Sequence, residues 1–301
     1  MAAPKTYALS TMWTVKRFSE LSPFFKGGEE AGFAAFELNH GVDSSMLKGL
    51  EGKNIQSVHE PCPADISTSV LKENDWLISA LDEENRRQGV LAIQRSIEFA
   101  FSLGVKRVVV HPGRVDSDYD TEGRMRELYS QGRRKEAEYE ALLRLNSESR
   151  ARSAEANLRQ VEKSLDELGS FAAERDILLG LENRYHFHEI PSPQELGRLL
   201  ERDSTGALGF WYDCGHAEVM DRLGFFAHEE WLVLNSRRII GTHFHDLRGV
   251  EDHQAAGSGD FDWSKIAGRI PEGALRTCEF QNSYSVAELA EGRKFLESLG
   301  V

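Results

Sequence analysis

Four residues with metal-ligand side chains stand far apart in this chain, each at the end of a short apolar run. They are Glu182, Asp213, His243 and Glu279. A lone Glu or His at such a position more often makes a structural hydrogen bond or contacts a substrate. Burying several carboxylates and imidazoles together, however, costs free energy unless the groups are paired or hold a cation. The joint pattern therefore predicts a metal centre, and its nitrogen and oxygen donors suit Zn²⁺, Mn²⁺ or Co²⁺ better than Mg²⁺.

Several histidines occupy equivalent positions and extend the set of candidate ligands. His59 and His111 each end an apolar run, and His216 follows Asp213 by three residues. The segment 248–260 is rich in Gly and carries Glu251, Asp252 and His253. It fits either a flexible polar loop or a further ligand pair, formed by His253 with one of the two acids.

Three arginines lie just beyond runs that carry candidate ligands: Arg114, Arg184 and Arg248. A guanidinium at this place would suit a phosphate or carboxylate on a small substrate, although arginines of solvated loops are the alternative interpretation. His186 and His188 are spaced by two, so they either face the same site or lie on a loop.

The elements that must position these residues follow from the hydrophobic pattern. Strand-like runs alternate with segments of helical spacing such as 83–103 and 193–201. Strands that alternate with helices run parallel, and eight such units close into a (β/α)8 TIM barrel, whose strand ends converge at one mouth. An open doubly wound sheet is less favoured because the first strand–helix turn lacks a GxGxxG loop. The eight predicted strands cover 7–12, 33–38, 55–59, 107–111, 177–182, 208–213, 239–245 and 275–280.

The connection after the fourth strand is far longer than a barrel loop requires. It predicts a helical insertion over about 114–162, with one or two long amphipathic helices across 133–168 and a final part that packs on the barrel. A surface excursion or a homodimer contact is one interpretation. A lid is the other, because the segment leaves from the catalytic face of such a barrel.

Length and composition limit the function classes. The 301 residues, 40% of them hydrophobic, suit a single domain over 1–301. The formal charge of -13 disfavours a broad surface for nucleic acid or anionic membrane. No apolar stretch is long enough to cross a bilayer, and the start of the chain lacks the features of a signal peptide. With three widely spaced cysteines and no disulfide pattern, we expect a cytoplasmic protein.

Around the candidate ligands the chain resembles the xylose isomerase-like TIM-barrel superfamily. This superfamily includes sugar-phosphate isomerases and epimerases, inosose dehydratases and isomerases, and endonuclease IV. The resemblance rests on Glu182-Asn183, on His216 three residues after Asp213, on Asp246 three residues after His243, and on the terminal Glu279.

In the ketose epimerase branch, the resemblance implies one metal held by Glu182, Asp213, His243 and Glu279. The two Glu residues would then be catalytic, one removing a proton next to the substrate carbonyl and the other returning it on the opposite face of an enediolate. His216 would orient the substrate.

The endonuclease IV branch would add zinc ions, one at His59 and His111 with Glu182, and another at His216 with an Asp-x-His pair. The chain departs from that branch in three places, one of which is its net charge of -13, which supplies no obvious groove for a DNA backbone. Arg-Tyr-His-Phe-His-Glu follows Glu182-Asn183 in place of a small Gly-containing segment, and only Glu251 keeps the spacing of the acid to His253.

We therefore expect a metal-dependent isomerase or epimerase of a small sugar, polyol or sugar phosphate, which acts by proton transfer next to a carbonyl. A zinc phosphodiesterase of the endonuclease IV kind and an inosose-type dehydratase are the alternatives. A nucleic-acid partner is disfavoured by the charge, and a homodimer remains open.

Overall fold

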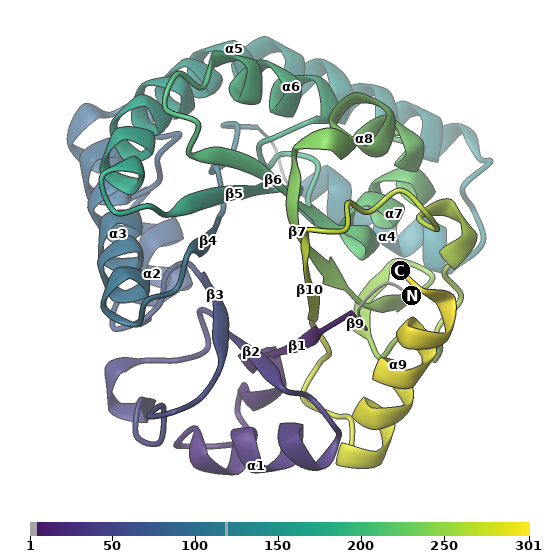
Figure 1. Cartoon of the computed structure of the whole chain (residues 1–301). Helices are drawn as coiled ribbons and strands as arrows, with labels where there is room; N and C mark the ends of the chain where they lie inside the picture. Colours follow the sequence, from purple (N-terminus) through teal and green to yellow (C-terminus); the bar gives the residue numbers. More distant parts are fainter. Residues whose placement is uncertain (1–4, 118–119) are drawn as a thin grey trace.

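Eight parallel strands close into a barrel, seen along its axis in Figure 1, with the helices outside it. The computed structural model describes residues 5–117 and 120–301. The strand order around the barrel is β1-β10-β7-β6-β5-β4-β3-β2, so the last barrel strand pairs with the first. The predicted (β/α)8 fold is confirmed. The barrel strands are β1 (Tyr7–Ser10), β2 (Ala35–Leu38), β3 (Ile55–His59), β4 (Arg107–Val110), β5 (Leu178–Glu182), β6 (Leu208–Asp213), β7 (Ile239–Phe244) and β10 (Leu275–Cys278).

The helices connect successive strands, and local capping sets where several of them begin. Ser192 and Ser285 each form a capping box with the Glu three residues later, which starts α6 and α9. The α-helices are α1 (Ser22–Glu30), α2 (Thr68–Glu73), α3 (Glu83–Ser102), α4 (Asp120–Ser130), α5 (Ala137–Ala173), α6 (Pro193–Arg202), α7 (Cys214–Leu223), α8 (His228–Asn235) and α9 (Val286–Leu299). Short 3-10 helices are η1 (Thr11–Thr14), η2 (Ser44–Met46), η3 (Ser236–Arg238) and η4 (Trp263–Lys265).

Two predicted segments take a different form. The run 7–12 ends its strand at Ser10, because the Ser10 side chain accepts from the Met12 backbone N–H and the chain turns into η1. The polar segment after β7 forms an antiparallel hairpin of β8 (Asp246–Arg248) and β9 (Glu251–Gln254) in place of a flexible loop.

Side chains two residues apart on a strand point into the barrel in layers, one below the other. Trp211 lies below Asp213 and fills the layer under the mouth, where it is fully buried. The neighbouring strands carry glycines at this level: a Cβ at Gly241 or Gly180 would lie 2.2 or 2.8 Å from the Trp211 ring. The indole can occupy the barrel axis only because both neighbours lack a side chain, and His243 then lies directly against it, with ring centroids 5.4 Å apart.

The long connection between β4 and β5 consists of α4 and a single 37-residue helix, α5. The C-terminal half of α5 packs on the barrel through buried residues such as Leu158, Val161 and Leu165. In its N-terminal half, Leu145 is exposed while Arg150 is buried. The expected packing of the last part against the barrel is therefore seen, although one continuous helix provides both halves.

Among the described residues, none of the helices combines the length and the apolar character that crossing a membrane requires.

Candidate metal centre

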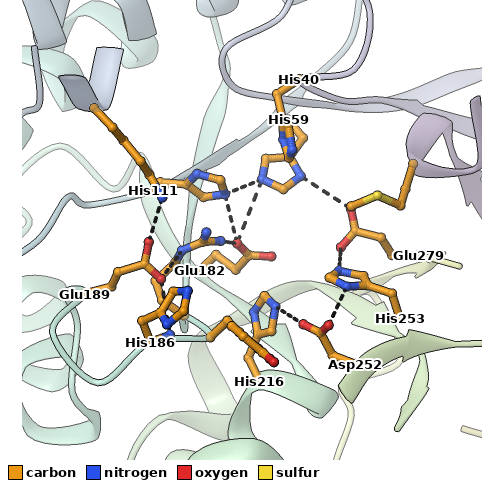
Figure 2. A pocket seen from close by; sticks show the side chains of 14 residues that line it. His40, His59, His111, Glu182, His186, Glu189, His216, Asp252, His253 and Glu279 are labelled. Carbon is orange, nitrogen blue, oxygen red and sulfur yellow. Dashed lines mark hydrogen bonds and ion pairs between the residues drawn. The ribbon is translucent and has the colours of Figure 1, made fainter. Parts of the chain in front are cut away.

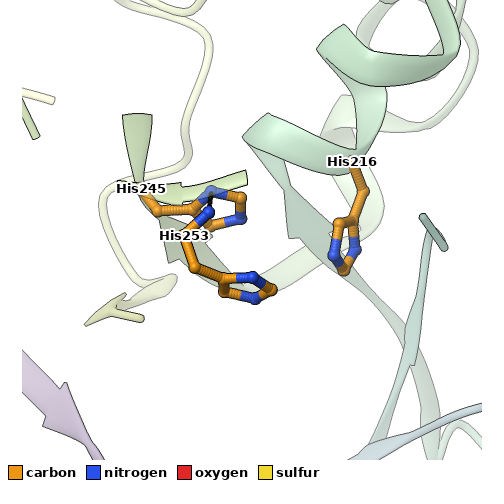
Figure 3. A group of neighbouring side chains, drawn as sticks. All are labelled: His216, His245 and His253. Atoms are coloured by element: carbon orange, nitrogen blue, oxygen red, sulfur yellow. Dashed lines mark hydrogen bonds between the residues drawn. The ribbon is translucent and has the colours of Figure 1, made fainter. Parts of the chain in front are cut away.

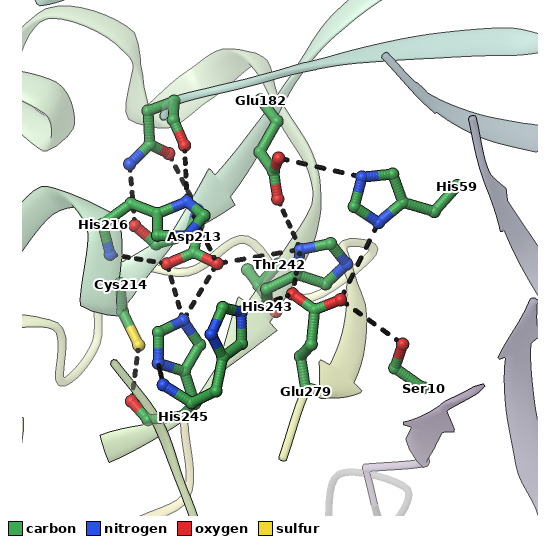
Figure 4. Close-up of polar contacts among 12 residues, drawn as sticks. Ser10, His59, Glu182, Asp213, Cys214, His216, Thr242, His243, His245 and Glu279 are labelled. Atoms are coloured by element: carbon green, nitrogen blue, oxygen red, sulfur yellow. Dashed lines mark hydrogen bonds and ion pairs between the residues drawn. The ribbon is translucent and has the colours of Figure 1, made fainter. Parts of the chain in front are cut away.

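The four residues of the predicted centre meet at the carboxyl end of the barrel (Figure 4). These four residues, called the quartet below, are Glu182, Asp213, His243 and Glu279. Each offers a ligand atom, and these atoms all lie within 4.8 Å of one another. All four side chains are buried. His243 lies between the carboxylates: its Nδ1 is 2.6 Å from Glu182 Oε1 and 3.2 Å from Glu279 Oε2. The site therefore brings together three carboxylates and one imidazole, all shielded from solvent. This donor set fits a divalent ion.

The orientation of His243 is set by a residue that the sequence reasoning missed, Glu37 of β2. Glu37 is fully buried, and its two carboxylate oxygens lie 3.0 and 3.2 Å from His243 Nε2. The Ser57 hydroxyl also donates to Glu37 at 2.7 Å. With Nε2–H donated to Glu37, the Nδ1 of His243 faces the centre. The only signal for Glu37 in the sequence is a charged residue inside a four-residue buried strand.

Asp213 is held from two sides. As the N-cap of α7, it accepts the backbone N–H of His216 at 2.7 Å, and its carboxylate lies 2.9 Å from His245 Nε2. The backbone N–H of His253 donates to His245 Nδ1 at 2.9 Å, so Nε2 of His245 carries the proton that Asp213 accepts. Gly215 makes this contact possible, since a Cβ there would lie 2.0 Å from the His245 ring.

A second group of candidate ligands adjoins the first and shares Glu182. His59 Nε2 and His111 Nε2 are 2.6 Å apart, and His111 Nε2 is 3.1 Å from Glu182 Oε2. His59 is buried, and its Nδ1 has no hydrogen-bond partner within the part of the chain that the structure describes. The structure thus places both predicted histidines beside the quartet (Figure 2).

A third group contains His216, His245 and His253 (Figure 3). The structure distinguishes the two acids of the segment 248–260. Asp252 lies 3.4 Å from His216 Nε2 and 3.0 Å from His253 Nδ1, whereas Glu251 is exposed. The backbone of His253 is left-handed, with φ of 55°, a conformation that costs energy in a non-glycine residue and recurs at functional sites.

Electrostatics keep the carboxylates ionised. Burial alone would raise the pKa of Glu182, but Arg184 and the imidazoles of His111 and His243 outweigh it and hold the pKa well below its usual range. Burial would likewise raise the pKa of Glu279, and His243 and His253 lower it. Burial, aided by Arg184, lowers the pKa of His111 to about 3. The centre therefore presents carboxylate anions and, at His111, a neutral imidazole, which are the forms that bind metal.

A cavity of about 310 Å³ opens above these groups (Figure 2). Of the three predicted substrate-binding arginines, Arg184 lines it. Arg114 lines a smaller neighbouring cavity, and Arg248 is exposed and donates to the Ser258 carbonyl, so neither reaches the mouth. The lining consists of Met12, His40, His59, Lys72, His111, Glu182, Arg184, Tyr185, His186, Glu189, His216, Asp252, His253 and Glu279.

The insertion reaches this cavity indirectly. Glu122 of α4 lies 2.9 Å from His186 Nδ1 and accepts the Phe187 backbone N–H, also at 2.9 Å. Arg150 of α5 donates to the carbonyls of Phe187 and Glu189. The insertion thus supports the segment after β5 from outside. His186 lines the cavity, whereas His188 lies against the smaller one.

The model of the xylose isomerase-like TIM barrel family matches residues 26–299. The chain belongs to this family. Among curated proteins it is 23% identical over 218 residues to an uncharacterized protein of Sinorhizobium fredii, covering 72% of this chain and 57% of that protein. An uncharacterized protein of Methanocaldococcus jannaschii is 26% identical over 197 residues, which are 64% of this chain and 56% of that one. The chain thus spans little more than half the length of these relatives.

Solved structures with the same fold include several sugar epimerases. A D-tagatose 3-epimerase-like protein superimposes with a TM-score of 0.67 at 20% identity, covering 98% of this chain and 96% of its own. The 3-keto-D-glucoside 4-epimerase YcjR of E. coli gives 0.66 at 16% identity, with 98% and 99% covered. The IolI protein, solved with a bound zinc atom, gives 0.62 at 14% identity, with 98% and 97% covered. At these identities the likeness establishes the shared fold.

Proposed function

We propose that this protein is a divalent-metal-dependent isomerase or epimerase of a small sugar, polyol or sugar phosphate. The observation that carries the proposal is the pair Glu182 and Glu279, which approach His243 from β5 and from the end of β10 and form one donor set with Asp213. Two carboxylates on separate strands, facing a common cavity, can act on opposite faces of one substrate carbon.

The chemistry divides between the ion and the chain. A bound divalent ion would polarise the substrate carbonyl and stabilise the negative charge that develops when the neighbouring carbon loses its proton. Glu182 and Glu279 would flank that carbon. One of them, as the carboxylate anion, would accept the proton, and the other would first take up a proton from solvent and then donate it to the carbon from the opposite side. Glu37 and His245 hold His243 and Asp213 in place during this exchange.

The cavity supports a small, polar substrate. Its volume of about 310 Å³ is at the lower end for small-molecule sites, and its walls are dominated by charged and imidazole side chains. His216 donates Nδ1–H to the Asn183 carbonyl, so its Nε2 faces the cavity beside Asp252. We assign His216 and Arg184 to substrate hydroxyl and anionic groups. An inosose-type dehydratase would share the proton-abstraction step.

Solvent exchange tests this function. The protein is stripped with a chelator, reloaded with Mn²⁺, Co²⁺, Mg²⁺ or Zn²⁺, and incubated in D2O with a panel of ketoses, their phosphates and inososes. We expect deuterium at the carbon next to the carbonyl, and Glu182→Gln or Glu279→Gln should slow its incorporation by about 10²–10⁴-fold. Glu251→Gln, an exposed acid of β9, is the matched control. Absence of exchange across the panel with every metal would overturn the proposal.

A phosphodiesterase of the endonuclease IV kind is a second candidate, because the two further ligand groups could hold additional ions. Cleavage of a duplex with an abasic site, together with more than one tightly bound ion per chain, would favour it. The charge of -13 opposes it, since DNA-binding surfaces rely on Lys and Arg.

A further inference from the structure

Arg184 shares a carboxylate oxygen with two of the candidate ligands. Its Nη1 contacts Glu182 Oε2, the same oxygen that lies 3.1 Å from His111 Nε2 and 3.8 Å from His59 Nε2. The Arg184 side chain is only 12% exposed, so its charge is not dispersed into solvent. The other oxygen of the carboxylate, Oε1, is the one that faces His243. Glu182 thus divides its two oxygens between the quartet and the guanidinium.

The chain builds this arrangement locally. Asn183 turns away from the mouth: its side chain donates to the Asp213 carbonyl and accepts the Asp213 backbone N–H, both at 2.8 Å. The residues before and after it in the sequence Glu-Asn-Arg are therefore free to meet in the cavity. The position of Arg184 therefore depends on these two hydrogen bonds of Asn183 as well as on its own charge.

Arg184 is also held at its other edge. Its Nε lies 3.6 Å from Glu189 Oε2. Glu189 already lies 3.3 Å from Lys72 Nζ and accepts the backbone N–H of His186. The segment that carries Glu189 is fixed in turn by Arg150 of α5. Arg184 is thus confined between two buried acids, and a change of rotamer toward Glu189 would place it beside Lys72, a like charge.

The two histidines pair with each other through their Nε2 atoms. Nε2 atoms of two imidazoles at 2.6 Å can share one proton, which makes one ring the donor and the other the acceptor. A divalent ion bound by His59, His111 and Glu182 Oε2 would have to break this hydrogen bond. It would also have to lie next to the guanidinium, in a buried region where like charges repel strongly.

We propose that Arg184 supplies the positive charge at the His59–His111–Glu182 corner and thereby limits the centre to a single divalent ion, held by Glu182, Asp213, His243 and Glu279. This inference rests on the proposed metal-dependent function. It assigns His59 and His111 to the cavity wall and makes Arg184 a determinant of how many ions the site accepts.

Counting ions tests the proposal without any activity measurement. Apoprotein is titrated with MnCl2 and ZnCl2 by calorimetry, and bound metal is measured after dialysis. We expect about one ion per chain in the wild type and about two in Arg184→Met, which keeps most of the side-chain volume but loses the charge. Arg184→Lys, which keeps the charge, should stay at about one ion. Arg184→Gln, which can still donate to Glu182, repeats the test if the Met variant does not fold.

Two further variants locate the second ion. In the background of Arg184→Met, His111→Ala should return the count to about one, because it removes a ligand of the corner. Arg248→Met removes an exposed arginine and should leave the wild-type count unchanged. One ion in both wild type and Arg184→Met, or two in the wild type, would overturn this inference alone. A wild type that binds no ion would overturn the metal-dependent function, and the inference with it.

Discussion

At the scale of single residues, Glu37 determines which nitrogen of His243 faces the centre. The Glu37 carboxylate accepts from His243 Nε2 and from the Ser57 hydroxyl, and all three side chains are fully buried. Burial alone would lower the pKa of His243, yet the carboxylates of Glu279 and Glu37 raise it well above its usual range. This raised pKa means that His243 carries a proton on Nδ1 in the absence of an ion. Binding of an ion at Nδ1 would release this proton, while the hydrogen bond from Nε2 to Glu37 keeps the ring in place.

We expect Glu37→Gln to weaken the binding of a divalent ion by about 10–100-fold, the usual effect of removing the group that orients a ligand. The amide keeps the volume but lacks the charge that favours the Nε2–H form of His243. Competition with a chromophoric chelator measures the dissociation constant. Glu30→Gln, an exposed acid on α1, is the control, and equal constants for the wild type and Glu37→Gln would contradict this role.

The sequence predicted the quartet but missed Glu37 for a physical reason. Glu182, Asp213 and Glu279 stand where apolar runs end, a position that any parallel barrel directs to its mouth. Glu37 lies one residue before the end of its strand, and it is recognisable only once the fold shows that β2 and β7 direct their side chains to the same point inside the barrel. The choice of Asp252 over Glu251 also depended on tertiary structure, because the β8–β9 hairpin determines which acid faces inward.

At the scale of elements, Glu218 of α7 joins three segments behind the centre. Its carboxylate lies 2.9 Å from His228 Nδ1 of α8, 2.7 Å from Lys265 Nζ of η4, and 3.0 Å from Arg222 Nε of its own helix. The side chain is buried. Burial would raise its pKa, but these three hydrogen bonds outweigh burial and lower the pKa to about 2. Since Asp213 is the N-cap of α7, the network supports a helix that orients a candidate ligand.

This lowered pKa predicts a pH-dependent effect of Glu218→Gln. A carboxyl group whose pKa is lower in the folded state stabilises the fold above its unfolded pKa, and that stability is lost as the pH falls through the folded pKa. At pH 7 the variant should be less stable by about 3 kcal/mol, from a difference of roughly two pKa units or more. The difference in unfolding free energy between wild type and variant should become smaller as the pH falls from about 4.5 toward 2.

Urea unfolding of wild type and Glu218→Gln at pH 7, 5, 4 and 3 measures this effect. Glu291→Gln, an exposed acid of α9, should match the wild type at every pH. A destabilisation that stays constant from pH 7 to pH 3 would show that lost packing, and not the ionised carboxylate, is responsible.

The elements themselves were predicted where the pattern was strong. Apolar runs such as Val108 to Val110 identified the buried strands within a few residues, because parallel strands covered on both faces are apolar throughout. The β8–β9 hairpin was not predicted, since its strands are short and Leu247 is their single apolar residue, which leaves no alternating pattern to recognise. The roles of α4 and α5 could not be predicted either, because they depend on long-range contacts such as Arg150 with the segment after β5.

At the scale of the whole molecule, four of the buried acids meet at one end of the barrel. Glu37, Glu182, Asp213 and Glu279 all converge on the few ångströms around His243. The protein carries a formal charge of -13 overall, so the surface provides little compensation for this internal negative charge. In the apoprotein, the neighbouring imidazoles and Arg184 offset it. Binding of a divalent ion should therefore stabilise the entire fold.

We expect saturating Mn²⁺ or Zn²⁺ to raise the melting temperature. An ion at about 100 times its dissociation constant contributes about 2.7 kcal/mol, which for a chain of this size corresponds to about 5 °C. Differential scanning fluorimetry with and without a chelator measures the shift. The matched variant is Asp213→Asn: Asn caps a helix as well as Asp does and still accepts from His245, so α7 should keep its start. With one anionic ligand lost, the metal-induced shift should largely disappear. Equal shifts in wild type and variant would place the stabilising ion elsewhere, and no shift in the wild type would contradict a metal centre.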